Sequence, residues 1–217
     1  MVEGPSDKDA LIPYIENKLF VNKMRVIVKE MHGDILTAYV DGQRIYKILP
    51  GNVRGELKKE ILKYFNKASV KAEQIKARDI TKIYYVTDTD YCFHSELDAH
   101  KNKSQCLRKM FNFGEMELVK NKPIDFNVIY FSKHLEHVIA NEEETLSEEE
   151  KQRISIEFGT RSLLEESFYE KHFRDKNIAT WSDYPQSYKN IQSYKGRACN
   201  MNNFLDELDQ IFKDNKK

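Results

Sequence analysis

Four carboxylates in two short segments are the residues of this sequence best suited to chemistry. Glu3 and Asp7 lie near the first residue, and Asp88 and Asp90 directly follow an apolar run. If both segments lie at the carboxyl ends of neighbouring parallel strands, the four side chains converge. Carboxylates at such close range repel one another and are usually held ionised by a hard divalent cation such as Mg²⁺. The sequence therefore predicts a metal-ion site.

Each motif also has a purely structural interpretation. Asp7 could cap a helix, and Asp90 could begin a turn. The spacing of Asp88 and Asp90 favours a site, because strand-end residues at i and i+2 face the same way. Gly4 permits a tight turn between Glu3 and Asp7. Together, the two motifs favour one shared site over two structural roles.

The elements that must position these residues alternate between strands and helices. The apolar patterns predict strands ending at residue 4 and over 24–30, 83–86 and 126–131, and helices over 6–19, 56–65 and 132–139. Pro13 is expected to kink or shorten the first helix. Asp41-Gly42, between apolar segments 36–40 and 45–48, predicts a β-hairpin. This order implies a parallel sheet, in which sites form at the carboxyl ends of the strands.

The last third of the chain is expected to be helical. Ser147 and Glu150 form a capping box that opens a helical pattern reaching Phe173, and a last helix is expected over 201–212. We therefore expect an α/β fold. A domain over residues 1–140 would contain a central parallel sheet flanked by helices, with a β-hairpin insertion, and residues 141–217 would form a mostly helical C-terminal extension.

The amino-acid composition bears on how the protein could bind nucleic acid and on the cellular compartment in which it is expected. Lys and Arg number 35, as do Asp and Glu, so no global field attracts a polyanion and nucleic acid must meet a local patch. Cys92, Cys106 and Cys199 are widely separated, which argues against a disulfide framework and a zinc knuckle. No apolar run is long enough to span a membrane, and the first residues lack a signal-peptide pattern. A cytoplasmic protein is expected.

The two acidic motifs together resemble those of the Toprim domain, the α/β domain of topoisomerases, primases and overcoming-lysogenisation-defect (OLD) nucleases. The resemblance rests on Val2-Glu3-Gly4 with Asp7 and on Asp88-Thr89-Asp90, and it covers roughly residues 1 to 140. Val-Glu-Gly-x-Ser-Asp is most similar to OLD-type and stand-alone Toprim nucleases used in phage defence. The resemblance thus implies a Toprim-like sheet and a nuclease.

The resemblance also implies roles for individual residues. Glu3 would be a metal ligand or general acid/base, Asp88 and Asp90 metal ligands, and Asp7 an additional ligand. Two Mg²⁺ or Mn²⁺ ions about 4 Å apart would clamp the attacking and leaving oxygens of a phosphodiester. Glu136, after the strand expected at 126–131, resembles the acidic residue that completes the second metal site. Its alternative is an ordinary exposed glutamate on a helix.

Basic residues offer several places for a nucleic acid. Tyr188, Tyr194, Lys195 and Arg197 form a basic aromatic stretch on which bases could stack. Lys195 could neutralise charge on the scissile phosphate, as a lysine does in related nucleases; a solvated loop is the alternative. Two further groups are either nucleic-acid contacts or ordinary exposed helix faces: Lys58, Lys59 and Lys63, and Lys101, Lys103, Arg108 and Lys109.

These motifs favour a Mg²⁺- or Mn²⁺-dependent endonuclease that hydrolyses RNA, such as tRNA, or DNA as the effector of an antiviral system. The chain has no phosphate-binding loop of the G-x-x-x-x-G-K-[ST] type, so a separate ATPase partner is expected. A homo-oligomer is also compatible with the sequence. The first alternative is a Toprim-fold module that binds nucleic acid or a partner without cutting. The second is a receiver-like regulatory domain, whose matching downstream Thr and Lys are not recognisable.

Overall fold

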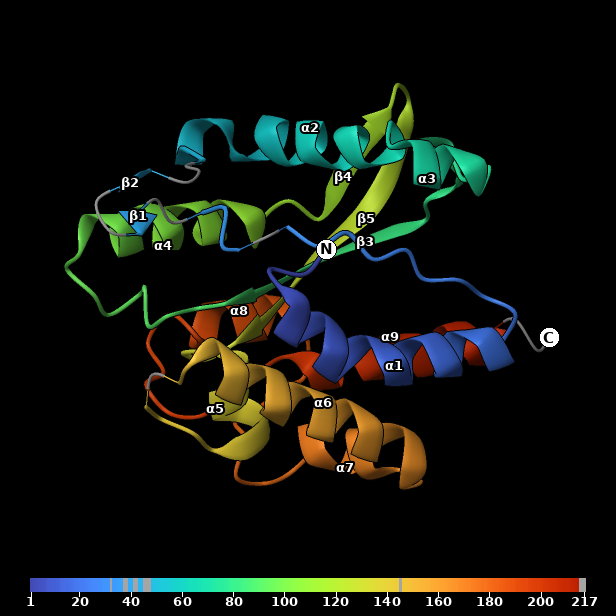
Figure 1. The fold of residues 1–217 in the computed structure, drawn as a ribbon. Coiled ribbons are helices and arrows are strands. Elements are labelled where there is room, and N and C mark those ends of the chain that lie inside the picture. Colours follow the sequence, from blue (N-terminus) through green and yellow to red (C-terminus); the bar gives the residue numbers. More distant parts are fainter. Residues whose placement is uncertain (32, 37–38, 41–42, 45–47, 145, 215–217) are drawn as a thin grey trace.

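The described part of the chain is an α/β structure. The computed structural model describes residues 1–31, 33–36, 39–40, 43–44, 48–144 and 146–214. Helices lie on both sides of a three-stranded sheet in the order β3-β5-β4 (Figure 1). The strands are β3 (Lys82–Asp88), β4 (Glu115–Val119) and β5 (Lys122–Phe131). The predicted α/β class is confirmed at this level.

The sheet is mixed and not wholly parallel as expected. β3 pairs in parallel with β5 from Lys82 opposite Asp125 to Asp88 opposite Phe131, which confirms the two strands predicted around 83–86 and 126–131. β4 pairs antiparallel with β5. The patterns over 92–122 predict no strand, but 115–119 alternates between exposed and buried residues, as a half-buried strand does.

Helices account for most of the other described elements. The α-helices in the described residues are α1 (Pro5–Val21), α2 (Val53–Phe65), α3 (Ala68–Ala72), α4 (Asp98–Met110), α5 (Leu135–Ala140), α6 (Glu148–Leu164), α7 (Phe168–Phe173), α8 (Tyr184–Asn190) and α9 (Met201–Asp214). Short 3₁₀ turns lie at η1 (Pro50–Asn52) and η2 (Ala77–Asp79). The predicted capping box is present, since Ser147 and Glu150 bond reciprocally at the start of α6. Within the described residues, no helix combines the length and the apolar character needed to cross a membrane.

A short extended segment at residues 1–3 lies beside β3. On one side, Val86 N donates to Met1 O (2.8 Å). On the other, Val2 N donates to Lys29 O (3.0 Å) and Met31 N donates to Val2 O (2.9 Å). Glu3, which follows directly, is therefore fixed by backbone hydrogen bonds on both flanks although few residues precede it.

One predicted β segment is smaller than expected, and another lies only partly within the described residues. The strand predicted over 24–30 is reduced to an isolated parallel bridge between Val2 and Glu30. In the hairpin region, β1 (Tyr39–Val40) pairs antiparallel with β2 (Gln43–Arg44), as the pattern predicts. The Asp41-Gly42 turn itself lies outside the described residues.

The sheet separates two apolar clusters. Because side chains alternate along a strand, Ile83 and Tyr85 of β3 pack with α2 and α4, whereas Val86 packs with α1, α6 and α9 on the other face. Residues from both sides of position 140 occur in each cluster; Tyr188 belongs to the first and Phe158 to the second. The predicted division into 1–140 and 141–217 stays a prediction, but these clusters do not separate at residue 140.

The C-terminal segment completes the edge of β5 that β4 leaves uncovered. Tyr188 OH accepts from Val128 N (2.8 Å), and Asn200 Oδ1 accepts from Tyr130 N (2.9 Å). Farther along, Phe131 forms an antiparallel bridge with Cys199. These contacts satisfy buried backbone groups that would otherwise be costly. They also fix the carboxyl end of β5, where one predicted site residue follows.

α1 continues through Pro13 to Val21, so the shortening expected at this proline does not occur. Proline has no N–H to bond the carbonyl of Asp9, and α6 packs close to this place through Gly159. A Cβ atom added at Gly159 would lie 2.1 Å from Asp9 O. The glycine therefore lets α1 and α6 approach closely, and this packing supports the start of α1.

Replacing Gly159 tests this close approach. We expect Gly159→Ala to lower the free energy of unfolding by about 2 kcal/mol, because the new methyl group must push two backbones apart. Gly55→Ala on α2 is the control, since nothing lies within 4 Å of its added Cβ and alanine favours helix. Urea unfolding of both variants measures the difference. Equal stability of the two variants would contradict the packing described.

Candidate functional site

Six carboxylates from four segments lie close enough to perturb one another's pKa. They surround the carboxyl end of β3 and are called the carboxylate cluster here: Glu3, Asp7, Asp34, Asp88, Asp90 and Glu136. All five acidic residues predicted for the site are members. The sequence patterns did not indicate Asp34.

The first two members are held by the turn into α1. Asp7 Oδ2 accepts from Gly4 N (2.9 Å), so Asp7 caps the helix from its third position, as the structural interpretation of this residue expects. Thr87 Oγ1 of β3 donates to Glu3 Oε1. Capping and membership of the cluster are therefore compatible, because one oxygen of Asp7 is enough for the cap.

Asp88 and Asp90 reach the cluster from different backbone conformations. Asp88 is the last residue of β3, whereas Asp90 lies beyond the strand with φ +47°. This left-handed conformation is uncommon outside glycine, although aspartate tolerates it better than most residues. Asp90 N donates to Lys133 O (2.8 Å), which fixes the turn. The expectation that both aspartates face alike from the end of one strand is thus wrong in its geometry.

Glu136 approaches from α5 and is 3 % exposed. Its Oε2 lies 3.1 Å from His134 Nδ1. Burial opposes ionisation of Glu136, but the contact with His134, a backbone hydrogen bond and the charge of Lys151 together lower its pKa. Lys151 of α6 lies near enough to feel these charges. Burial disfavours its ammonium form, but the ion pair with Glu148 and the negative charges of Glu136 and Asp88 together raise its pKa. Glu136 is therefore a buried member of the cluster and not the exposed helix residue of the alternative interpretation.

A fully buried lysine lies among these carboxylates. Lys103 Nζ of α4 is 2.5 Å from Asp34 Oδ2, 2.5 Å from Asp90 Oδ2 and 3.9 Å from Glu3 Oε1. The side chain of Lys103 is 0 % exposed, whereas that of Asp90 is 39 % exposed. The cluster thus has a closed side at Lys103 and reaches the surface at Asp90.

Burial and mutual repulsion oppose the ionisation of two cluster members. Burial raises the pKa of Glu3 well above its usual range, against the attraction of Lys103. Burial raises the pKa of Asp88 in the same way, and the negative charge of Asp7 is the next largest cause. A carboxylate whose pKa is raised by burial and like charge is stabilised by an added cation.

Asp88 also has an oxygen that nothing satisfies in the described residues. Its Oδ1 is buried and has no hydrogen-bond partner there. A buried polar atom without a hydrogen-bond partner is destabilising. Such an atom is often one that binds an ion, a ligand or a water molecule. Among the described residues, no three His, Cys, Asp or Glu side chains form a ready-made metal-binding group. The donor chemistry nevertheless suits Mg²⁺ or Mn²⁺, because all members are carboxylates.

Lys195, the basic residue predicted to take part in catalysis, forms no ion pair with the cluster in the described residues. Lys195 is exposed and takes part in no ion pair in the described part of the chain. The lysine among the carboxylates is Lys103, which belongs to a group that the sequence pattern left open as an exposed helix face. Tyr194, beside Lys195, is 39 % exposed and contacts Trp181 edge to face. The role predicted for Lys195 thus has no geometric support from these contacts.

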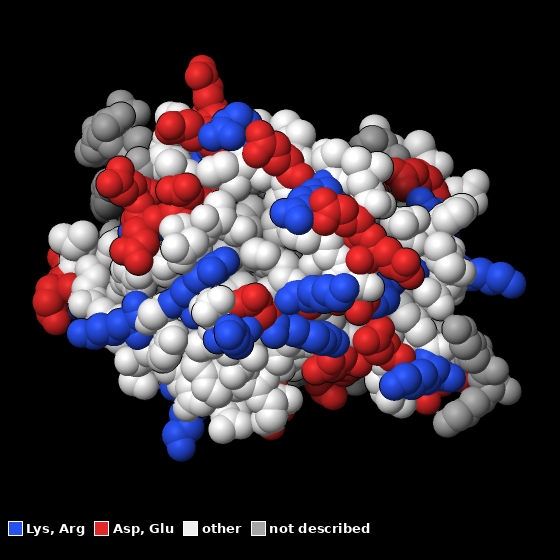
Figure 2. Space-filling model, turned by 90° about the horizontal axis from the view of Figure 1, so that it is seen from below, with Lys and Arg blue, Asp and Glu red and all other residues white. Residues whose placement is uncertain are grey.

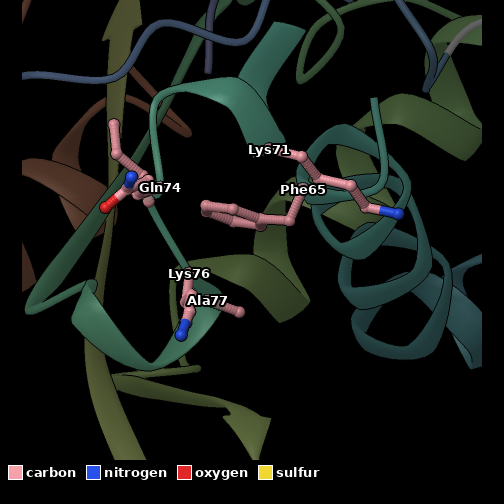
Figure 3. A pocket seen from close by; sticks show the side chains of 6 residues that line it. Phe65, Lys71, Gln74, Lys76 and Ala77 are labelled. Carbon is pink, nitrogen blue, oxygen red and sulfur yellow. The ribbon is translucent and has the colours of Figure 1, made fainter. Parts of the chain in front are cut away.

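A shallow pocket lies elsewhere, between the end of α2 and the segment after α3. It has a volume of about 340 Å³ and is lined by Phe65, Lys71, Gln74, Ile75, Lys76 and Ala77. The ring of Phe65 points from α2 towards Gln74 and Ala77 (Figure 3). No carboxylate of the cluster lines this pocket, so the two features are separate.

Comparison of the chain with protein-family models, with curated proteins and with solved structures gave no match. The Toprim resemblance accordingly stays a prediction from the two acidic motifs.

The raised pKa of Asp7 predicts a pH dependence of stability. Burial raises this pKa to about 6, although backbone hydrogen bonds from Gly4 oppose the shift. Below pH 6 the folded state therefore binds more protons than the unfolded state, and stability from this group increases as the pH falls. Between pH 7.5 and 5.5 we expect a gain of about 1 kcal/mol, or about 3 °C in melting temperature, in protein freed of metal.

The Asp7→Asn variant should lose this gain, because asparagine does not titrate and its oxygen can still accept from Gly4 N. The control is Glu16→Gln, a change on the exposed face of the same helix. Thermal melts of wild type and both variants at the two pH values measure how much of the gain depends on the carboxyl group of Asp7. An unchanged gain in Asp7→Asn would disprove the assignment.

Proposed function

We propose that this protein is a divalent-metal-dependent nuclease that hydrolyses phosphodiester bonds of RNA or DNA. The observation that supports this proposal best is the buried Asp88 Oδ1, which lacks a partner in the described residues and lies among like charges at the carboxyl end of β3. The carboxylates of the cluster outnumber the cationic side chains beside them, so an added cation would reduce their mutual repulsion. A hard divalent cation would supply this positive charge, and it would also activate water and a phosphoryl group for hydrolysis.

In this proposal some carboxylates of the cluster would bind the metal ion and another would accept a proton. Asp7 and Asp88 would hold a Mg²⁺ or Mn²⁺ ion, with Glu136 beside them. The bound ion would polarise a phosphoryl oxygen and make water more acidic. Glu3, oriented by Thr87, would accept the proton of the attacking water once the charge of a bound cation offsets the burial that raises its pKa.

A polyanion would approach the cluster where the side chain of Asp90 is 39 % exposed, and basic side chains elsewhere on the surface would have to offset the negative charge of the cluster. Figure 2 shows Lys and Arg side chains gathered across the middle of the lower face, with Asp and Glu side chains among and around them. Such mixed charge suits local phosphate contacts better than long-range attraction. Binding is therefore expected to weaken as salt concentration rises, with few phosphates neutralised.

A second candidate is a module that binds nucleic acid or a protein partner without cutting it. The ion pairs of Lys103 favour it, because the ammonium already neutralises part of the cluster without any metal. The antiviral role and the separate ATPase partner are proposed from the motif resemblance alone. Metal-dependent cleavage separates the two candidates.

Cleavage assays with carboxylate variants test the proposed function. Purified protein with Mn²⁺ should cleave at least one of three substrates offered separately: plasmid, single-stranded DNA and total tRNA. Glu3→Gln and Asp88→Asn should each lower the rate by about 100-fold or more, because a lost metal ligand or base removes several kcal/mol of transition-state stabilisation. Gel analysis of product against time measures the rates.

The matched control is Asp98→Asn, a change of the same chemistry at the exposed start of α4. It should cleave at the wild-type rate. Wild-type cleavage by both Glu3→Gln and Asp88→Asn would refute the proposal, as would activity that persists in excess chelator.

A further inference from the structure

The ammonium of Lys103 already occupies a cation position in the carboxylate cluster. It lies 2.5 Å from one oxygen each of Asp34 and Asp90 and 3.9 Å from Glu3 Oε1, and no part of its side chain is exposed. A buried charge is tolerated only when it is paired and hydrogen-bonded. Three acidic neighbours around one ammonium satisfy this condition.

The fold holds this lysine in place by contacts other than its ion pairs. Asn102, the preceding residue of α4, donates through Nδ2 to Leu36 O (2.8 Å) and to Ile48 O (2.9 Å). In the same loop, Leu36 N donates to Asp34 Oδ1 (2.7 Å). The helix that carries Lys103 and the loop that carries Asp34 are thus fixed to each other, so the lysine position is built into the fold.

In the described residues no ammonium is ion-paired to Asp7 or Asp88, and Lys151, on which the charge of Asp88 acts, pairs with Glu148. The ion pairs of Lys103 include neither Asp7 nor Asp88 in the described residues, and the buried Asp88 Oδ1 has no partner there. Asp7 Oδ2 accepts from Gly4 N in the helix cap, and backbone hydrogen bonds from Gly4 and Glu3 oppose the burial that raises the pKa of Asp7. The repulsion between Asp7 and Asp88 is the largest effect of a neighbouring charge on Asp88.

We propose that Lys103 replaces one of the two metal ions that the motif resemblance implies, so that the site binds a single divalent ion between Asp7 and Asp88. Mg²⁺ is commonly held by only one or two carboxylates, with water and substrate phosphate completing its shell. This inference rests on the proposed metal dependence. Lys103 is a positioning residue, because its buried side chain contacts no substrate. Its ion pairs with Asp34 and Asp90 keep these two carboxylates from binding a metal ion.

Counting bound ions tests the inference directly. Metal-free protein is titrated with Mn²⁺, and free Mn²⁺ is measured by electron paramagnetic resonance alongside calorimetry. We expect one Mn²⁺ per chain in wild type and two in Lys103→Met, because a second ion can take the place of the ammonium beside Asp34 Oδ2 and Asp90 Oδ2. Lys101→Met, on the same helix with an exposed side chain paired to Glu96, should keep one.

Variants that retain Lys103 keep the test valid even if Lys103→Met does not fold. Asp88→Asn should weaken Mn²⁺ binding by about tenfold or more, whereas Asp34→Asn should leave one ion bound with nearly wild-type affinity. A purely structural lysine would change the stability of its variants and not the number of ions. Equal weakening in Asp34→Asn and Asp88→Asn would overturn the inference.

The outcomes separate this inference from the proposed nuclease activity. One bound Mn²⁺ without cleavage would retain the inference and reject the nuclease. Cleavage by wild type carrying two Mn²⁺ would retain the nuclease and reject the role of Lys103. Wild type that binds no Mn²⁺, or a folded Lys103→Met that still binds one, would also reject it.

Discussion

Like charges confined together away from bulk water are the constraint on which this structure depends. Glu3 and Asp88 are both disfavoured in their ionised forms by burial, and each feels the charge of Asp7. The arrangement persists because the backbone around it is fixed: residues 1–3 bond on both flanks, and Lys103 is pinned beside Asp34 through its helix. Stability lost at the cluster is thus offset elsewhere, which is common where a protein keeps charges for function.

The supporting structure comes from distant parts of the chain. The C-terminal segment completes the edge of β5 through Tyr188 and Asn200, and α6 packs against α1 at Gly159. Both contacts act on elements beside the cluster, since Asp7 lies in the first turn of α1 and Glu136 lies in α5, which follows β5. A site made of residues before position 140 therefore relies on packing from residues after it.

Strong local signals were sufficient to predict much of this fold. The apolar runs of β3 and β5, the capping box of α6 and the five acidic members of the cluster were all expected from residue type and spacing. Lys103 and Asp34 were missed because the burial of Lys103 depends on carboxylates from three separate segments, and its own neighbours look like an exposed basic face. β4 was missed although its alternation at 115–119 carries a strand signal. Pro13 was misjudged because a close contact with Gly159 is invisible in a local pattern.

The position of a bound ion tests the account most directly. Crystals soaked in Mn²⁺ and measured at its absorption edge would show an anomalous peak wherever manganese binds. The account predicts one peak within coordinating distance of carboxylate oxygens of Asp7 and Asp88, with the Lys103 ammonium still between Asp34 and Asp90. Manganese found only on exposed acidic residues such as Glu148 and Glu149, with none at Asp88, would contradict it.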